Sequence, residues 1–196
     1  MKKILVCLLL IVFCAPAFAQ KPDYRRPAHL GISFILNDFT TAQRIRTTSL
    51  TSVLNNKQTA KIREMSSGLG ITYFKGLTKF IDFAGTVSGS FASIKNDNNS
   101  TSGGDNFLLE TDASAQFKLF SDSYVVSPYL NAGVGFSHYD GKFDAILPLG
   151  VGFKFNIMDE ASIFINGQYR TPITNQANNY HFQYGIGFSS AIGQKK

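Results

Sequence analysis

Tryptophan is absent from this chain of 196 residues, and cysteine occurs only twice, as Cys7 and Cys14. Beyond residue 14 the sequence therefore offers no thiol for a disulfide, a metal site or a nucleophile. After residue 19 it also lacks any apolar run of about 20 residues, the length that a transmembrane helix needs. The formal net charge of +6 is a mild excess, which does not by itself indicate a nucleic-acid partner.

The N-terminal stretch MKKILVCLLLIVFCAPAFAQ has the order of a secretory signal. Two lysines precede an apolar stretch at residues 4–13, and the small-residue motif Ala-Phe-Ala ends at Ala19. This order predicts a signal peptide over residues 1–19 that is cleaved after Ala19. A membrane-anchor helix is the alternative, but the apolar stretch is shorter than the roughly 20 residues of a span. An exported protein is not expected to bind nucleic acid.

The remaining sequence alternates apolar with small or polar residues, most regularly in YHFQYGIGFSSAI at residues 180–192. A period of two indicates β-strands with two different faces. In a water-soluble barrel the small and polar face would have to fill the core, which would leave voids and unpaired polar groups. The pattern instead favours apolar side chains toward lipid and polar side chains toward a lumen.

Eight strands are predicted, at residues 29–36, 66–74, 80–94, 107–119, 125–138, 144–156, 162–171 and 180–192. Strands of about 9 to 11 residues can span a bilayer when tilted, and closure pairs every backbone group. The short connections KGLTK, SDS and MDEA alternate with polar and mostly longer ones, as in outer-membrane barrels. The sequence therefore predicts an all-β fold, an eight-stranded antiparallel up-and-down transmembrane β-barrel over residues 28–196, preceded by a lead-in at residues 20–27.

Two features of the predicted strands affect their backbone. Pro148 has no N–H group, so we expect a local break in the strand ladder there. Glycines at inward positions, Gly133, Gly135, Gly150 and Gly152, are expected to make room for larger side chains from opposite walls. No helix follows these glycines, so they are not phosphate-binding loops.

The inward positions also carry three acidic and three basic residues: Asp82, Glu110, Asp112, Lys118, Lys154 and Arg170. The interior of an eight-stranded barrel is only about wide enough for its own side chains. An unpaired buried charge costs several kcal/mol, so we expect these six residues to pair and to close the lumen. Contact with lumen water alone is the alternative.

Two pairings are predicted among these charges. If the hairpin of the third and fourth strands is symmetric about Ser100, Asp82 and Lys118 lie directly opposite each other. Arg170 is expected to reach across the lumen toward Glu110 and Asp112, because its planar fork suits carboxylates.

The long polar segment at residues 37–64 is rich in basic residues: Arg44, Arg46, Lys57, Lys61 and Arg63. These are candidate contacts to the phosphates of lipopolysaccharide. The alternative is a solvated loop without a ligand. The stretch QRIRTTSLTSVLNNKQTAKIREM is also compatible with a hairpin turning at Asn55-Asn56, whose exposed edge would suit a surface protein partner by strand addition.

Three stretches carry a resemblance to a known family: SPYLNAGVGFSHYDG, ILPLGVGFKFNIMDEASIFINGQYR and YHFQYGIGFS. With their repeated G-V-G-F and aromatic strand ends, they resemble the small outer-membrane barrels of the OmpA/OmpX type, most closely those of Bacteroidetes-like bacteria. The resemblance implies the cell outer membrane as location, its lipid and lipopolysaccharide as surroundings, and the barrel assembly machinery as a partner. Two features depart from the family pattern: we expect no peptidoglycan-binding domain of the kind found in full-length OmpA proteins, and the sequence reads GQKK at residues 193–196 where many barrels have an aromatic residue.

These observations favour a structural or surface-interaction role, with a small channel for ions or apolar solutes as the first alternative. A lipid A-modifying enzyme is the second, and would need a histidine, a serine and an acid close together at the rim. The local cluster His138-Tyr139-Asp140 lacks a suitably spaced serine, so we expect no enzymatic activity. His29 and His181 face inward as hydrogen-bonding groups, and neither a metal nor another cofactor is expected.

Overall fold

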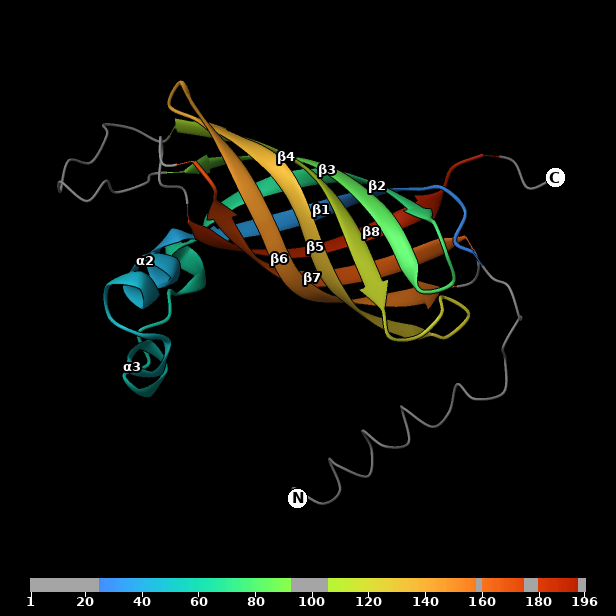
Figure 1. The fold of residues 1–196 in the computed structure, drawn as a ribbon, viewed down its shortest axis with the longest axis horizontal. Helices are drawn as coiled ribbons and strands as arrows, with labels where there is room; N and C mark the ends of the chain where they lie inside the picture. Colours follow the sequence, from blue (N-terminus) through green and yellow to red (C-terminus); the bar gives the residue numbers. More distant parts are fainter. Residues whose placement is uncertain (1–24, 93–105, 158–159, 175–179, 194–196) are drawn as a thin grey trace, which may run out of the picture.

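The computed structural model describes residues 25–92, 106–157, 160–174 and 180–193. Eight antiparallel strands form a closed barrel, in which β8 also pairs with β1 (Figure 1). The strands are β1 (His29–Asp38), β2 (Ser66–Gly76), β3 (Ile81–Ala92), β4 (Asn106–Lys118), β5 (Val126–Tyr139), β6 (Lys142–Ile157), β7 (Ala161–Pro172) and β8 (His181–Ala191). This arrangement confirms the predicted all-β, eight-stranded antiparallel barrel.

Side chains alternate between the two faces of the wall as the sequence pattern predicts. Outward apolar residues are largely exposed, for example Ile32 at 64% and Val134 at 62% of their full accessible surface. Inward polar residues such as Asp82 and Ser127 are completely buried. The barrel therefore has an apolar exterior and a polar interior, which is the arrangement of a barrel surrounded by lipid.

The two ends of the barrel differ. At the terminal end β1 begins and β8 ends, with His29 opposite Ala191, and the connections β2–β3 and β4–β5 lie here. At the opposite end, called the helix end below, the connection from β1 to β2 forms two α-helices (Figure 1). No helix in the described ranges is long and apolar enough to cross a membrane.

The connection between β1 and β2 contains α2 (Phe39–Thr47), α3 (Leu50–Asn55) and a 3₁₀ turn (Ile62–Glu64). Asp38 caps α2 by accepting a hydrogen bond from the Thr41 N–H at 2.8 Å. Ser49 caps α3 in the same way, with the Ser52 N–H at 3.1 Å. A short acceptor side chain at this position satisfies a free N–H group of the first turn. The hairpin alternative, with its turn at Asn55-Asn56, is therefore wrong.

The connection between β5 and β6 is shorter than the sequence pattern suggested. Asp140 (φ 51°) and Gly141 (φ 72°) alone link the two strands, which extend to Tyr139 and from Lys142. Positive φ at both central residues is the geometry of a two-residue type I′ hairpin turn, for which Asp-Gly is a preferred sequence.

Pro148 interrupts the pairing of β6 with β5, as predicted. Pairs are missing at Gly133 and Val134, opposite Pro148 and Leu147, while the register on both sides is unchanged. On its other edge β6 remains paired, with Pro148 opposite Arg170. The missing N–H group of proline therefore weakens one ladder without shifting a strand.

The inward glycines make room for neighbouring strands and not for opposite walls. A Cβ atom on Gly152 would lie 2.3 Å from Cζ of Tyr129, the residue directly paired with it on β5. On Gly133 and Gly135 it would lie 2.5 and 2.4 Å from carbonyl oxygens of β4, and on Gly150 2.3 Å from one of β7. At Gly152 the room is taken by a larger side chain, as expected, but it comes from the adjacent strand; at the other three glycines the nearest atoms are backbone oxygens of the adjacent strand, so the predicted origin in opposite walls was wrong.

Candidate functional site

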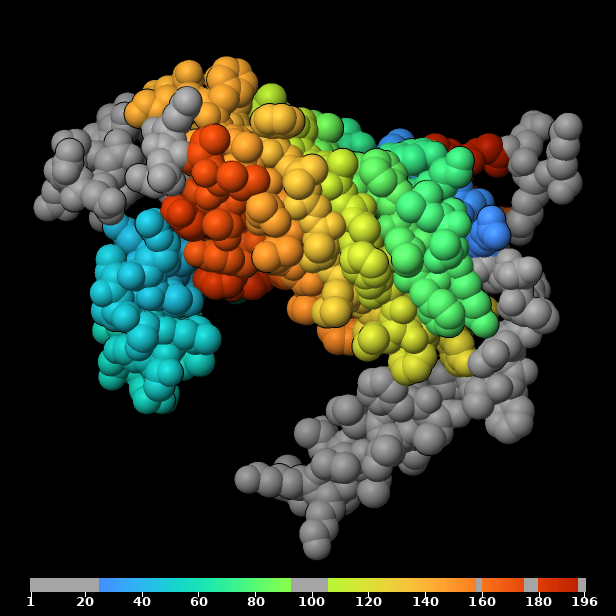
Figure 2. All heavy atoms as spheres, viewed as in Figure 1, coloured from blue at the N-terminus to red at the C-terminus, as the bar shows by residue number. Residues whose placement is uncertain are grey.

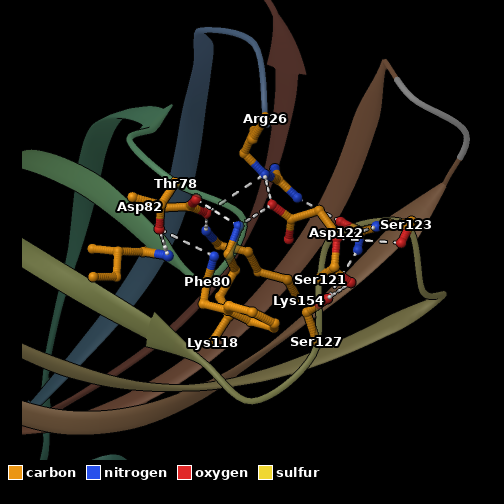
Figure 3. A network of polar contacts seen from close by, with 12 residues as sticks. Arg26, Thr78, Phe80, Asp82, Lys118, Ser121, Asp122, Ser123, Ser127 and Lys154 are labelled. Carbon is orange, nitrogen blue, oxygen red and sulfur yellow. Dashed lines mark hydrogen bonds and ion pairs between the residues drawn. The ribbon is translucent and has the colours of Figure 1, made fainter. Parts of the chain in front are cut away.

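Five charged side chains gather in the lumen near the terminal end and form the terminal-end cluster: Arg26, Asp82, Lys118, Asp122 and Lys154. Figure 3 shows the two carboxylates between the three basic groups. Asp82 comes from β3, Lys118 from β4 and Lys154 from β6, all at inward positions of the alternating pattern. Arg26 precedes β1, and Asp122 lies in the connection between β4 and β5.

Each carboxylate of this cluster binds at least two cations. Asp82 Oδ1 lies 2.6 Å from Lys118 Nζ, and its Oδ2 lies 2.9 Å from Lys154 Nζ. Asp122 Oδ2 lies 2.5 Å from Lys118 Nζ and 3.1 Å from Arg26 Nε. All five side chains are at most 3% exposed, so these ion pairs are shielded from water and are weakly screened by salt.

Arg26 connects the lead-in to distant parts of the barrel. Its guanidinium Nη1 donates to Ser162 Oγ on β7 at 3.0 Å, and its Nη2 donates to Asn156 Oδ1 on β6 at 2.5 Å. Its carbonyl oxygen accepts the Gly76 N–H at 3.1 Å. A Cβ atom on Gly76 would approach the Arg26 backbone nitrogen to 2.6 Å, so only glycine allows this contact. Arg26 is thus fixed across the terminal end.

Asp122 lies outside the strands and is strongly affected by its neighbours. Burial alone would raise the pKa of its carboxyl group. The positive charges of Arg26, Lys154 and Lys118, together with the hydrogen bond from Arg26, outweigh burial and lower this pKa from 3.8 to about 2. Asp122 is therefore ionised at every physiological pH.

A second group of polar side chains, the helix-end cluster, is organised around Arg170 of β7. Its Nη1 lies 3.2 Å from Glu110 Oε2 and its Nη2 lies 2.8 Å from Asp112 Oδ2, both from β4. The same Nη2 donates to Gln183 Oε1 on β8 at 2.7 Å. Arg170 and Glu110 are each 1% exposed, and Arg170 is the largest fully buried side chain in the described residues. The Arg170 guanidinium group therefore occupies this part of the lumen together with the polar side chains that bind it.

Further polar residues extend the helix-end cluster toward α2. Gln183 Nε2 donates to Asn37 Oδ1 at 3.1 Å, and Asn37 Nδ2 donates to Ser90 Oγ at 2.8 Å. His181 Nε2 lies 3.3 Å from Glu110 Oε2, and its ring packs against Phe39 of α2 in a tilted arrangement, with 4.7 Å between the centroids. The lumen contacts are thus continuous with the first turn of the external helix.

The structure brings all six predicted lumen charges into ion pairs, and one predicted register is wrong. Asp82 is directly opposite Gln116, two residues from Lys118, so the hairpin is not symmetric about Ser100. Asp82 and Lys118 still meet, because a long lysine side chain spans the diagonal between neighbouring strands. The expected contacts of Arg170 with Glu110 and Asp112 are both present.

Sequence reasoning missed Arg26, Asp122 and the ionic contact of His181. Period-two alternation assigns a facing only to residues inside strands, and Arg26 and Asp122 lie outside them. An acidic residue in a short Ser-Asp-Ser connection reads as an exposed turn residue. His29 and His181 lie at opposite ends of the barrel, since His29 pairs with Ala191 and His181 follows the last loop.

The five candidate lipopolysaccharide contacts, Arg44, Arg46, Lys57, Lys61 and Arg63, are all exposed. Two of them also have contacts within the protein. Arg44 Nη1 donates to the Gln58 carbonyl oxygen at 2.6 Å, and the Arg46 guanidinium carbon lies 3.7 Å from the centroid of the Tyr180 ring. Lys57, Lys61 and Arg63 are exposed on the connection after α3 and can be reached by a ligand.

The residues His138, Tyr139 and Asp140 do not converge. The His138 ring packs against Phe143 with 4.4 Å between the centroids, while the Tyr139 hydroxyl donates inward to the Ala92 carbonyl oxygen. Asp140 lies at the turn and accepts a hydrogen bond from Asn106 at 3.3 Å. Within the described ranges no group of three or more His, Cys, Asp or Glu side chains is arranged to hold a metal ion.

A closed barrel with an apolar exterior and a charged interior defines an integral membrane β-barrel. The chain belongs to the outer membrane protein beta-barrel domain family, which it matches over residues 5–189. It is accordingly a small eight-stranded barrel protein of the outer membrane. Its likeness to a Bacteroidetes-type subgroup stays a prediction.

Solved structures share this fold at low sequence identity. Neisserial surface protein A (NspA) is 11% identical, with a TM-score of 0.61 over 86% of this chain and 99% of that chain. The N-terminal barrel domain of Pseudomonas aeruginosa OprF is 11% identical, with a TM-score of 0.52 over 85% and 98%. OprG from Pseudomonas aeruginosa is 11% identical, with a TM-score of 0.50 over 85% and 96%. No curated protein sequence matches the chain significantly.

Proposed function

We propose that this protein is a non-conducting outer-membrane barrel with a structural or surface-interaction role, which holds the helical connection between β1 and β2 at the cell surface. The observation that carries the proposal is the pair of charge clusters in the lumen. Arg170, Lys154 and Glu110 are each at most 1% exposed and are bound to partners from other strands. A closed lumen leaves the two ends and the lipid-facing surface as places for function.

The channel alternative would require both clusters to open, because they follow one another along the same lumen. Opening the terminal end means separating Asp82 and Asp122 from the three cations that bind them. Separating buried charges without replacing their partners costs several kcal/mol each. The filled interior therefore supports a structural role over a channel for ions or apolar solutes. An enzymatic role finds no support in the divergent positions of His138 and Asp140.

The proposal also includes the location and the processing of the chain. A signal peptide over residues 1–19 and the insertion of the barrel by the assembly machinery would deliver it to the outer membrane. The longest connection, between β1 and β2, lies at the helix end, so this end is placed outward, where its basic residues meet lipopolysaccharide. Trypsin added to intact cells should then cleave after Lys57 or Lys61, and recovery of the chain from the soluble periplasm would contradict this assignment.

Conductance measurements test the closed lumen. The purified barrel in planar bilayers should give no steady current, whereas the double variant Arg170→Ala, Lys154→Ala should give discrete openings because a large buried cation is then missing from each cluster. Arg25 is exposed and adjoins the terminal-end cluster, so Arg25→Ala is the matched control and should show no conductance. Large steady conductance of the unmodified protein would refute the proposal and favour the channel.

A further inference from the structure

The helical segment, defined as residues 39–65, carries exposed apolar side chains that the barrel wall does not explain. Leu50 is 55% exposed, Leu54 is 59% exposed and Ile62 is 72% exposed. Leu50 and Leu54 are four residues apart and share one side of α3. Apolar residues on the strands face lipid, but these three lie on helices and turns outside the strands.

The positive charge of the chain is concentrated in the same segment. Five basic residues against the single acidic Glu64 give it a formal charge of +4, out of +6 for the whole chain. Lys57, Lys61 and Arg63 lie within nine residues of Leu54 in the sequence. A short helical element that combines exposed leucines with several cations has the composition of helices that lie at an anionic membrane surface.

The segment is held in a fixed shape. Ala42 and Val53 are completely buried, and the Ala60 N–H donates to Thr41 Oγ1 at 2.8 Å. The hydrogen bond from Arg44 to Gln58 joins the loop after α3 to α2. A preformed surface loses little conformational entropy when it binds.

The segment also lies beside the lipid-facing wall. Figure 2 shows it at the helix end, projecting sideways beyond the barrel and not over its centre. Arg46 contacts Tyr180 just before β8. On the outward face of the wall nearby, Tyr169 and Phe182 pack with 4.9 Å between their centroids, an aromatic pair of the kind that marks a membrane interface.

From these observations we propose that the helical segment docks on the lipid surface around the barrel. Leu50, Leu54 and Ile62 enter the boundary between headgroups and acyl chains, and Lys57, Lys61 and Arg63 bind lipid phosphates. The occupant of this surface is therefore the phosphate-bearing lipid of the leaflet at the helix end. This inference rests on the proposed membrane location, but not on the closed lumen.

The absence of tryptophan from the chain provides a direct test. Leu54→Trp places a single reporter on α3, and the refolded protein is studied in vesicles of phosphatidylcholine with or without phosphatidylglycerol or lipid A. With brominated acyl chains as quenchers, we expect strong quenching in the anionic vesicles and weak quenching in phosphatidylcholine alone. Replacing Lys57, Lys61 and Arg63 by Gln should weaken docking, by about fivefold for each lost cation.

Two further reporters separate the possible failures. Val134→Trp lies on the lipid-facing wall and should be quenched in every vesicle. Asn55→Trp lies on the same helix at an exposed polar position and should be quenched less than Leu54→Trp. If Val134→Trp is not quenched, the barrel is not in the bilayer and the proposed function fails as well.

Three outcomes would overturn the lipid-docking proposal while leaving the barrel intact. The first is a Leu54→Trp reporter that stays in water in all vesicles while Val134→Trp is quenched. The second is quenching that is equal with neutral and anionic lipid. The third is shielding from both lipid and aqueous quenchers that grows with protein concentration, which would identify a second copy of the chain as the occupant.

Discussion

The two charge clusters of the lumen balance their buried charges in different ways. The terminal-end cluster has three basic and two acidic groups, which come from three strands, one connection and the lead-in. The helix-end cluster has one arginine against two carboxylates, with His181 beside Glu110. Charge is therefore distributed over several cations at one end and depends on a single cation at the other.

This difference predicts unequal tolerance to mutation. Without Arg26 the terminal-end cluster would keep two cations and two carboxylates, so its formal charge would be balanced. Without Arg170 the helix-end cluster would keep two buried carboxylates and no permanently charged cation. An unpaired buried charge is far more costly than a missing hydrogen bond, so the helix end is the more vulnerable of the two.

Arg170→Ala should have the largest effect. We expect the free energy of unfolding to fall by about 3–5 kcal/mol, because Glu110 and Asp112 lose their common partner. Urea titration of the refolded barrel, followed by the mobility of unboiled protein on gels, measures this loss. Arg170→Lys keeps the charge without the planar fork and should be intermediate. A loss below 1 kcal/mol would show that the helix-end cluster does not depend on this cation.

Arg26→Ala should have a smaller effect, measured in the same titration. Its hydrogen bonds to Asn156 and Ser162 disappear, but Asp122 keeps Lys118, so we expect a loss of about 1–3 kcal/mol. Arg25→Ala is the matched control, since Arg25 is exposed and should change stability little. Should Arg26→Ala prove as costly as Arg170→Ala, the proposed difference between the clusters would be wrong.

The smallest expected effect is the loss of stability at acidic pH that is due to Asp122. The pKa of Asp122 is lower in the folded protein than its ordinary value, so its ionised form stabilises the folded state above pH 3.8. This contribution is lost as the pH falls from 3.8 toward about 2, where the folded-state carboxyl group takes up its proton. The stability difference between wild type and Asp122→Asn should therefore shrink over this range. A difference that does not change with pH would contradict the assignment.

The fold was predictable because a barrel surrounded by lipid needs apolar residues outside and polar residues inside, and this need appears as an alternation within each strand. Outward Val134 and inward Asp82 follow from parity alone, and parity also placed Arg170 and Glu110 in one lumen. The external helices were not predictable in this way, since their caps, Asp38 and Ser49, are single polar residues in a polar segment.

The candidate site was predictable in composition but not in detail. The register of β3 and β4 depends on the connection between them, and residues 93–105 of this connection lie outside the described part of the chain. The sequence alone does not fix the centre of this hairpin, so symmetry about Ser100 was an assumption. Lys118 reached Asp82 despite the shift of two residues because its side chain is long. Arg26 came from a lead-in for which periodicity makes no statement.

The pairing of β1 with β8 has a consequence for how the barrel forms. Seven of the strand pairings join strands that are consecutive in the sequence, whereas His29 and Ala191 come from almost opposite ends of the chain. Hairpins form readily because their contacts are local in the sequence, whereas the pairing of β1 with β8 requires nearly the whole polypeptide to be present. Arg26 lies shortly before β1 and binds Asn156 on β6 and Ser162 on β7. Its contacts therefore add a second connection between the first and last parts of the barrel, beside the β1–β8 pairing.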